Sequence, residues 1–135
     1  MFEAGNIMTK EVVTVNKGTL IYEAMRLLLD KHVSGLPVVD DHNKLVGIIT
    51  EKDMLRILID TESSVNKSVA DYMIKNVKSF TPEDSIVTIC EFLIQNNYRR
   101  VPILEKGILV GIVSRRDIIS FIVKLRSECL DKPKQ

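Results

Sequence analysis

Residues 47–58 read GIITEKDMLRIL, and residues 111–122 read GIVSRRDIISFI. Each stretch runs from a glycine through two aliphatic residues to a hydroxyl residue, two charged residues and an aspartate, and then continues with apolar residues at helical spacing. This order predicts a buried strand that leads directly into a helix. Because the stretch returns 64 residues later, the chain is expected to contain one structural unit twice.

The similarity extends over both halves of the chain. At a spacing of 65 residues, Met8 corresponds to Met73 and Pro37 to Pro102. The spacing falls to 64 in the glycine-containing stretches, since the turn before them is one residue shorter in the second half. The predicted motifs are therefore residues 1–64 and residues 65–135.

Each motif is predicted to have the order β-α-β-β-α. In the first half a β-branched strand is expected at 12–15 and a helix from Ile21 onward. Two buried strands are expected at 36–39 and 44–50, followed by a closing helix at 51–60. In the second half the first strand is expected at 77–80 and the closing helix at 115–126, and Thr81 followed by Pro82 predicts a capped helix start. Residues 61–68 are expected to be a polar linker, and residues 130–135 a frayed end.

The composition limits the class of protein. With 45% hydrophobic and 27% charged residues the chain is expected to be globular, and its formal net charge of +1 gives no general attraction to nucleic acid or membrane. Two isolated cysteines, the lack of a signal peptide and the lack of an apolar run near the roughly 20 residues of a membrane span predict a cytoplasmic location. No metal-binding histidine spacing, nucleophile motif or glycine-rich phosphate loop is visible. The sequence therefore predicts no enzyme activity, no metal and no cofactor.

Both halves resemble the CBS domain, named after cystathionine β-synthase. The resemblance covers residues 7–124 and is carried by HVSGLPVVD and LVGIITEKD in the first half and by NYRRVPILEKGILVGIVSRRD in the second. It implies an α/β (α+β) fold in which two pseudo-symmetric motifs pack sheet to sheet, as in a Bateman module. Such modules bind AMP, ADP, ATP or S-adenosylmethionine in clefts between paired motifs and commonly form dimers. Since no further domain is visible, the resemblance implies a stand-alone sensor that acts on an unidentified protein.

The repeated hydroxyl and aspartate have two interpretations. A Thr or Ser three residues before an Asp fits a helix capping box, worth about 1 kcal/mol. The resemblance instead implies that Thr50, Asp53, Ser114 and Asp117 grip the ribose, and a carboxylate is able to accept hydrogen bonds from both ribose hydroxyls. The two roles are compatible, because a helix N-terminus also favours phosphate.

Further site residues are carried over from the family in two sets. The Thr50 and Asp53 pair is expected to act with residues of the second half: Ser79, Thr81, Ile86, Tyr98 and Arg99. The Ser114 and Asp117 pair is expected to act with residues of the first half: Thr14, Asn16, Ile21, Val33 and Ser34. The strand residues Ile48 and Ile112 complete the predicted binding positions. Tyr98 either stacks on adenine or fills the core.

Arginines distinguish the two halves. Arg99 and Arg100 take the places of Ser34 and Gly35, and Arg116 takes the place of Lys52. Guanidinium groups suit phosphate oxygens, so the arginines favour AMP, ADP or ATP over the cationic S-adenosylmethionine. For Arg115, phosphate binding and plain surface charge are equally good interpretations.

The leading hypothesis is a regulatory adenine-nucleotide sensor. The alternatives are single-stranded RNA or DNA binding, which the net charge and the 5% aromatic content disfavour, and a protein-interaction scaffold without a ligand. The apolar residues of the closing helices, at 54–59 and 118–125, predict a homodimer face.

Overall fold

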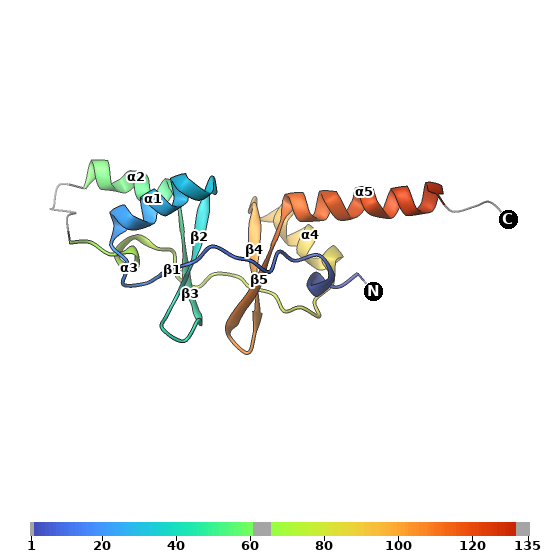
Figure 1. The fold of residues 1–135 in the computed structure, drawn as a ribbon, viewed down its shortest axis with the longest axis horizontal. Coiled ribbons are helices and arrows are strands. Elements are labelled where there is room, and N and C mark those ends of the chain that lie inside the picture. The colour runs from blue at the N-terminus through green and yellow to red at the C-terminus, as the bar shows by residue number, and fades with distance from the viewer. Residues whose placement is uncertain (1, 61–65, 132–135) are drawn as a thin grey trace. The chain divides into compact units, whose positions relative to one another are not determined.

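The computed structural model describes residues 2–60 and 66–131 and confirms the predicted mixed α/β fold. The elements follow one another in the order η1 (Ala4–Asn6), β1 (Val15–Asn16), α1 (Ile21–Lys31), β2 (Gly35–Val39), β3 (Leu45–Thr50), α2 (Glu51–Ile59), α3 (Val69–Tyr72), α4 (Ile86–Gln95), β4 (Arg100–Glu105), β5 (Ile108–Ser114) and α5 (Arg115–Asp131) (Figure 1). They form two compact units. The β1–β3 unit comprises residues 13–77 and 106–109, and the β4–β5 unit comprises the remaining residues on either side of these segments.

The β1–β3 unit is built on a three-stranded sheet in the order β1-β2-β3. β1 runs parallel to β2, with Val15 opposite Val38, and β3 runs antiparallel to β2, with Leu36 opposite Ile49. Every residue of β2 is buried, as expected for a continuous apolar run in the middle of a sheet. In Figure 1, α1, α2 and α3 lie on the same side of this sheet.

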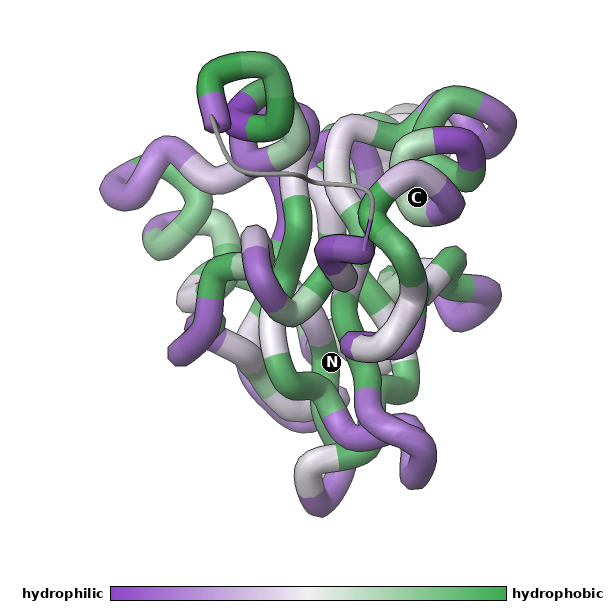
Figure 2. Tube along the Cα trace, turned by 90° about the vertical axis from the view of Figure 1, so that its left-hand side faces the viewer, coloured by the Kyte–Doolittle hydropathy of each residue, from purple (hydrophilic) through white to green (hydrophobic). Residues whose placement is uncertain are grey.

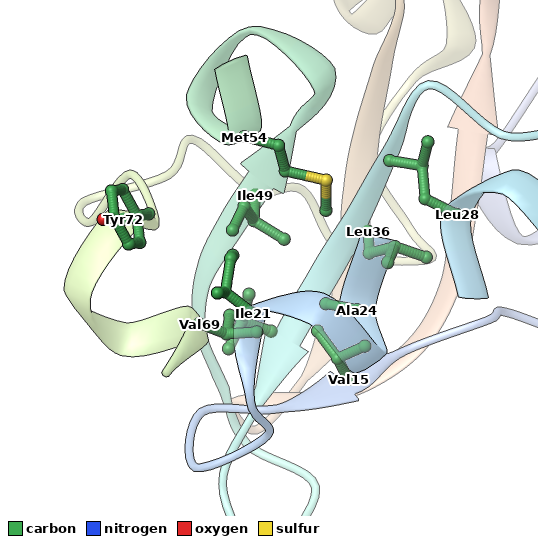
Figure 3. Packing of buried hydrophobic residues seen from close by; sticks show 10 residues of the cluster. Val15, Ile21, Ala24, Leu28, Leu36, Ile49, Met54, Val69 and Tyr72 are labelled. Carbon is green, nitrogen blue, oxygen red and sulfur yellow. The ribbon is translucent and has the colours of Figure 1, made fainter. Parts of the chain in front are cut away.

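The core of this unit joins apolar side chains from all its helices and strands. α1 contributes Ile21, Ala24 and Leu28, whose spacing of three and four residues places them on one face of the helix. Figure 3 shows these side chains directed toward residues of the sheet and of the other helices. The buried cluster consists of Val15, Ile21, Ala24, Leu28, Leu36, Val38, Ile49, Met54, Val69 and Tyr72. Burial of each large side chain contributes roughly 1.5–3 kcal/mol, so this cluster fixes the helices on the sheet.

The β4–β5 unit contains a two-stranded sheet of β4 and β5. A third strand is reduced to one parallel bridge between Phe80 and Ile103, in which the Phe80 N–H donates to the Pro102 carbonyl at 3.0 Å. In the tube of Figure 2, hydrophobic and hydrophilic stretches alternate along the chain. The core residues are Ala4, Phe80, Ile86, Ile89, Leu93, Val101, Ile103, Val113 and Ile118.

Each compact unit contains a short segment that belongs to the other sequence motif. Thr9 forms an antiparallel bridge with Ile112 of β5, and the corresponding residue Ile74 forms one with Ile48 of β3. Residues before 13 therefore belong to the β4–β5 unit, whereas residues 66–77 belong to the β1–β3 unit. The compact units thus divide the chain differently from the predicted motifs 1–64 and 65–135.

A glycine on the receiving strand allows each of these segments to approach closely. A Cβ atom at Gly111 would lie 2.6 Å from the Met8 Sδ, and one at Gly47 would lie 2.6 Å from the Ile74 carbonyl oxygen. Contacts this short are essentially never seen for a Cβ atom, so a side chain at either position would force a neighbouring atom to shift. The glycine that opens both repeated stretches is therefore explained by backbone packing, without reference to a ligand.

Two predicted strands are shorter in the structure. The strand expected at 12–15 is only Val15–Asn16, since the pairing with β2 begins at Val15 opposite Val38. The strand expected at 77–80 is only the bridge at Phe80, and residues 77–79 are not in a strand. Both expected strands therefore began too early.

The predicted helix start at Thr81 was wrong. α4 begins at Ile86, and the hydroxyl of its N-cap Ser85 accepts the Val87 N–H. The Asp84 carboxylate instead accepts the Thr81 N–H at 2.7 Å, which closes a turn ahead of the helix. Pro82 suits such a turn as well as it suits a first helical turn, so the sequence signal was ambiguous.

The linker and the closing helices also differ in detail from the predictions. α2 confirms the helix expected at 51–60, whereas α5 continues to Asp131, beyond the expected end at residue 126. α3 was not predicted and begins directly after Ser68, at the end of the expected linker. Of that linker, residues 61–65 lie outside the described residues, as do residues 132–135 of the expected frayed end.

Candidate ligand site

Thr50 and Asp53 form a capping box at the start of α2. The Asp53 Oδ2 accepts the Thr50 N–H at 2.9 Å and the Thr50 hydroxyl at 2.8 Å, while the Thr50 Oγ1 accepts the Asp53 N–H at 3.4 Å. Only 3% of the Asp53 surface is exposed. The structural role predicted from spacing is therefore present.

Ser114 and Asp117 form the corresponding box at the start of α5. The Ser114 N–H donates to the Asp117 Oδ2 at 2.8 Å, and the Asp117 N–H donates to the Ser114 Oγ at 3.1 Å. A third residue contacts this carboxylate, because the Thr9 hydroxyl donates to Asp117 Oδ1 at 3.2 Å. Asp117 is half-buried and Thr9 is exposed, so a polar group of three residues meets solvent in the β4–β5 unit.

Sequence reasoning missed the Thr9 contact. Thr9 lies 108 residues from Asp117, and no local pattern connects them. The only available signal was the match of Met8 with Met73, which places Thr9 opposite Ile74 in the repeat. In the repeat the polar Thr9 thus corresponds to the apolar Ile74. This difference becomes informative only in the structure, where Thr9 pairs with β5 and Ile74 with β3.

A third capping box shows what the motif does without a predicted ligand. The Ser68 N–H donates to the Asp71 Oδ2 at 2.8 Å at the start of α3. This Ser-x-x-Asp sequence has the same spacing as the other two. Capping alone is therefore sufficient to account for the motif, and a ligand role for Asp53 or Asp117 needs further support.

The loop before each middle strand is joined to the closing helix of the same unit. The Glu51 N–H donates to the Ser34 carbonyl at 3.0 Å, and the Arg115 N–H donates to the Arg99 carbonyl at 3.0 Å. Ser34 thus lies at the start of α2 and Arg99 at the start of α5. The structure brings Arg99 to the Ser114 and Asp117 box within one unit.

The Arg115 side chain is bonded to the loop that precedes β4. Its Nε donates to the Tyr98 carbonyl at 2.8 Å, and its terminal nitrogen donates to the Asn97 Oδ1 at 3.2 Å. These bonds hold the loop that carries Arg99. Arg99 and Arg116 are exposed, and Arg100 is half-buried at the start of β4. Arg116 lies in the first turn of α5, at the positive end of the helix dipole.

Tyr98 is 45% exposed. Its ring meets Phe92 edge to face with 5.2 Å between centroids, and Phe92 meets Phe80 in the same way at 5.5 Å. The expectation of a residue that simply fills the core does not fit this exposure. Stacking of this exposed residue on adenine stays a prediction, since aromatic rings favour planar partners.

Several other predicted positions serve the fold. Ile21 and Ile86 are buried in the two cores, and their N–H groups donate to the carbonyls of Lys67 and Phe2. The Asn16 Nδ2 donates to the Asp41 Oδ1 at 2.9 Å. The partly buried members of the predicted set are Thr14, Val33, Ile48, Ser79 and Ile112, whereas Thr81 is exposed. Their roles toward a ligand stay predictions.

Among residues 2–60 and 66–131, no group of three or more His, Cys, Asp or Glu side chains is placed to hold a metal ion. No helix in the same part of the chain is long and apolar enough to cross a membrane.

The repeated β-α-β-β-α order and the capped closing helices define the class of protein. The CBS domain matches residues 4–60 and 69–124, and the chain belongs to this family. It is a tandem pair of CBS domains, as predicted from LVGIITEKD and LVGIVSRRD.

The chain is similar to several known proteins. Protein MJ1225 of Methanocaldococcus jannaschii is 34% identical over 116 residues, which are 86% of this chain and 41% of that protein. Inosine-5′-monophosphate dehydrogenase of the same organism is 35% identical over 118 residues, but the match spans only 23% of the enzyme. The chain therefore covers less than half of these two relatives.

Solved structures show the same fold. CBSX2, a CBS-pair protein from Arabidopsis thaliana, was solved in complex with AMP and gives a TM-score of 0.83 at 26% identity, covering 93% of this chain and 99% of that chain. The CBS domain pair of protein MJ0100 was solved with 5′-methylthioadenosine and S-adenosyl-L-methionine and gives a TM-score of 0.77 at 28% identity, covering 90% of this chain and 96% of that chain.

Proposed function

We propose that this chain is a regulatory module that binds an adenine nucleotide (AMP, ADP or ATP) and reports its presence to another protein. The observation that carries the proposal is the carboxylate of Asp117, held at the start of a helix by the Ser114 N–H and the Thr9 hydroxyl. A carboxylate in this setting is able to accept the two ribose hydroxyls. The complex of the similar protein CBSX2 with AMP supports this ligand class.

The phosphate groups are assigned to the arginines around α5. Arg99 and Arg116 are exposed near the N-terminus of α5, where the helix dipole adds to their positive charge. A cationic sulfonium would be repelled by the same groups, so S-adenosylmethionine is the less favoured ligand. Tyr98 supplies an exposed ring for the adenine.

The signal is proposed to be a shift of population between conformations. A ligand shifts such an equilibrium only by the difference in its affinity for the two states. The reader of that shift is an unidentified protein, and the chain itself is assigned no catalysis. The reduced cysteines Cys90 and Cys129 fit a cytoplasmic location.

A homodimer is part of the proposal. The exposed apolar residues of the closing helices are Leu55, Leu58 and Ile59 on α2 and Ile119, Ile122, Val123 and Leu125 on α5. Leu58 is 94% exposed. Surfaces of this kind are typical of a contact between proteins.

The proposal is tested by calorimetry of the purified protein with AMP, ADP, ATP, adenosine and S-adenosylmethionine. We expect the nucleotides to bind and Arg116→Gln to weaken ATP binding about tenfold while adenosine binding is unchanged, as for a charged hydrogen bond of roughly 1.5 kcal/mol. Arg126→Gln is the matched control, because Arg126 is exposed on the same helix away from its start. Binding of single-stranded RNA in place of mononucleotides, or binding of none of these ligands, would refute the proposal.

A further inference from the structure

The two aspartates differ in what lies beside them. Thr9 and Ile74 occupy equivalent positions, since each pairs with the isoleucine two residues before the capping hydroxyl. Thr9 provides a hydroxyl to Asp117 at 3.2 Å, whereas an isoleucine at position 74 has no donor in its side chain. The repeat is therefore symmetric in backbone pairing and asymmetric in chemistry.

The anchoring of the two carboxylates differs as a result. Within the described part of the chain, the Asp53 carboxylate accepts two hydrogen bonds, both on Oδ2, at 2.9 and 2.8 Å, so it is held through one oxygen. Asp117 accepts the Ser114 N–H on Oδ2 at 2.8 Å, and the Thr9 hydroxyl lies 3.2 Å from Oδ1 and 3.5 Å from Oδ2. The shorter Thr9 contact is to Oδ1, so both oxygens of Asp117 have a partner. Since each carboxylate oxygen has two acceptor positions, Oδ1 retains one of them.

The capping hydroxyls differ in the same direction. The Thr50 hydroxyl proton is donated to Asp53. The Ser114 Oγ accepts the Asp117 N–H, and its proton is donated to none of the residues in the described part of the chain. Ser114 is thus able to donate to a ligand oxygen without giving up a bond. Asp53 is also 3% exposed, whereas Asp117 is only half-buried.

We infer that Thr9 is a positioning residue that orients the Asp117 carboxylate for the ribose hydroxyls, so that the Asp117 group binds nucleotide more tightly than the Asp53 group. This inference rests on the proposed function. The physical reason is preorganisation, since a carboxylate already held in the required plane loses less rotational freedom when the ligand arrives. Thr9 also remains exposed, which leaves its oxygen free to accept a hydrogen bond.

The test compares AMP with 2′-deoxy-AMP, which lacks one of the two ribose hydroxyls. Dissociation constants for both are measured by calorimetry on the wild-type chain, Thr9→Val, Thr9→Ala and Thr9→Ser. We expect Val and Ala to weaken AMP binding about tenfold, the factor that corresponds to loss of one hydrogen bond to a charged group. The dissociation constant of 2′-deoxy-AMP should change much less. The ratio of the dissociation constant of 2′-deoxy-AMP to that of AMP should therefore fall. Thr9→Ser keeps the hydroxyl and should retain the ratio.

Thr88→Val is the matched control, because Thr88 is exposed on α4 in the same unit and its side chain forms no hydrogen bond with residues 2–60 or 66–131. A role in stability alone would change both constants by the same factor, and that result would overturn the inference. If Thr9→Val and Thr9→Ala both discriminate between AMP and 2′-deoxy-AMP as the wild-type chain does, the inference is overturned as well, while the proposed function stays intact. Failure of the wild-type chain to bind AMP at all would refute the proposed function and this inference together.

Discussion

The Thr9 hydroxyl donates to the Asp117 carboxylate across 108 residues of sequence, at 3.2 Å to Oδ1. This contact exists because the segment around Thr9 pairs with β5, through reciprocal backbone bonds with Ile112 of 2.8 and 2.9 Å. The N-terminal segment is therefore part of the candidate site and of the fold of the β4–β5 unit. The same pairing in the other unit brings an isoleucine instead, so the two potential binding groups are not equivalent.

Gly47 and Gly111, which the segments around Ile74 and Thr9 approach closely, differ in how much they resist substitution. At Gly47 a Cβ would lie 2.6 Å from the Ile74 carbonyl oxygen, which is fixed in a bridge, whereas at Gly111 the nearest atom is the mobile Sδ of Met8 and the Thr9 carbonyl lies at 3.1 Å. We expect Gly47→Ala to reduce the free energy of unfolding by about 2–3 kcal/mol and Gly111→Ala by about 1 kcal/mol. Urea denaturation of both variants measures this, and equal losses would show that the backbone contact at Gly47 relaxes freely.

Ile74→Thr is expected to give Asp53 the donor that Asp117 obtains from Thr9. Ile74 is half-exposed, so the substitution should leave the fold intact. The comparison is made in an Asp117→Asn variant, in which Asp53 is the remaining aspartate predicted to bind ribose. There we expect Ile74→Thr to raise the affinity for AMP several-fold, as for one added hydrogen bond of about 1 kcal/mol. Ile74→Val is the control for the change in shape. The expectation is wrong if Thr and Val at this position give the same affinity.

Much of the fold was predictable because it depends on local patterns. The glycine-to-aspartate stretches identified β3 with α2 and β5 with α5, since a buried strand and a capped amphipathic helix leave clear signals over about ten residues. The start of α4 was missed because Pro82 and Asp84 suit a turn as well as a helix. The pairing of each motif's N-terminal segment with a strand of the other motif was also missed. No pattern within one motif indicates which β-strand this segment will pair with.

The candidate site was predictable only in part, for the same physical reason. Its hydroxyl and aspartate residues follow from the spacing, but the anchoring of Asp117 by Thr9 depends on tertiary structure. Arg115 could not be separated from its neighbours by sequence, yet its guanidinium is engaged with Asn97 and Tyr98. The resemblance to the family supplied Tyr98 and Arg99, for which composition and periodicity give no signal.

The hydrogen bond between Tyr72 and Asp60 should make the stability of the fold depend on pH in the alkaline range. The Tyr72 hydroxyl donates to the Asp60 Oδ2 at 2.8 Å, and this bond, together with burial, raises the pKa of Tyr72 above its ordinary value of 10.0. A raised pKa means that the bond stabilises the fold fully below pH 10 and that this stability is lost as the pH rises through the folded-state pKa. We expect Tyr72→Phe to lower Tm at neutral pH and the difference from wild type to vanish in strong alkali. A difference that stays constant over the alkaline range would contradict this assignment.

Leu58 should be a central residue of the proposed dimer contact, because its side chain is 94% exposed on α2. Leu58→Asp is expected to convert a dimer to a monomer without loss of Tm, since the side chain contributes nothing to the core. Leu29→Asp, at an exposed apolar position of α1, is the control and should remain dimeric. Sedimentation equilibrium gives the mass directly, and a wild-type mass of one chain at all concentrations would refute the dimer.

The central claim is that Asp117 binds the ribose in addition to capping α5, and calorimetry with AMP on Asp117→Asn and Asp71→Asn tests it most directly. Each variant alters an aspartate in a capping box of the same spacing, and each is expected to lose about 1 kcal/mol of stability or less, which thermal unfolding checks first. We predict that Asp71→Asn binds AMP as the wild-type chain does and that Asp117→Asn binds it at least tenfold more weakly. Equal AMP affinity in the two folded variants would mean that Asp117 is a helix cap and nothing more.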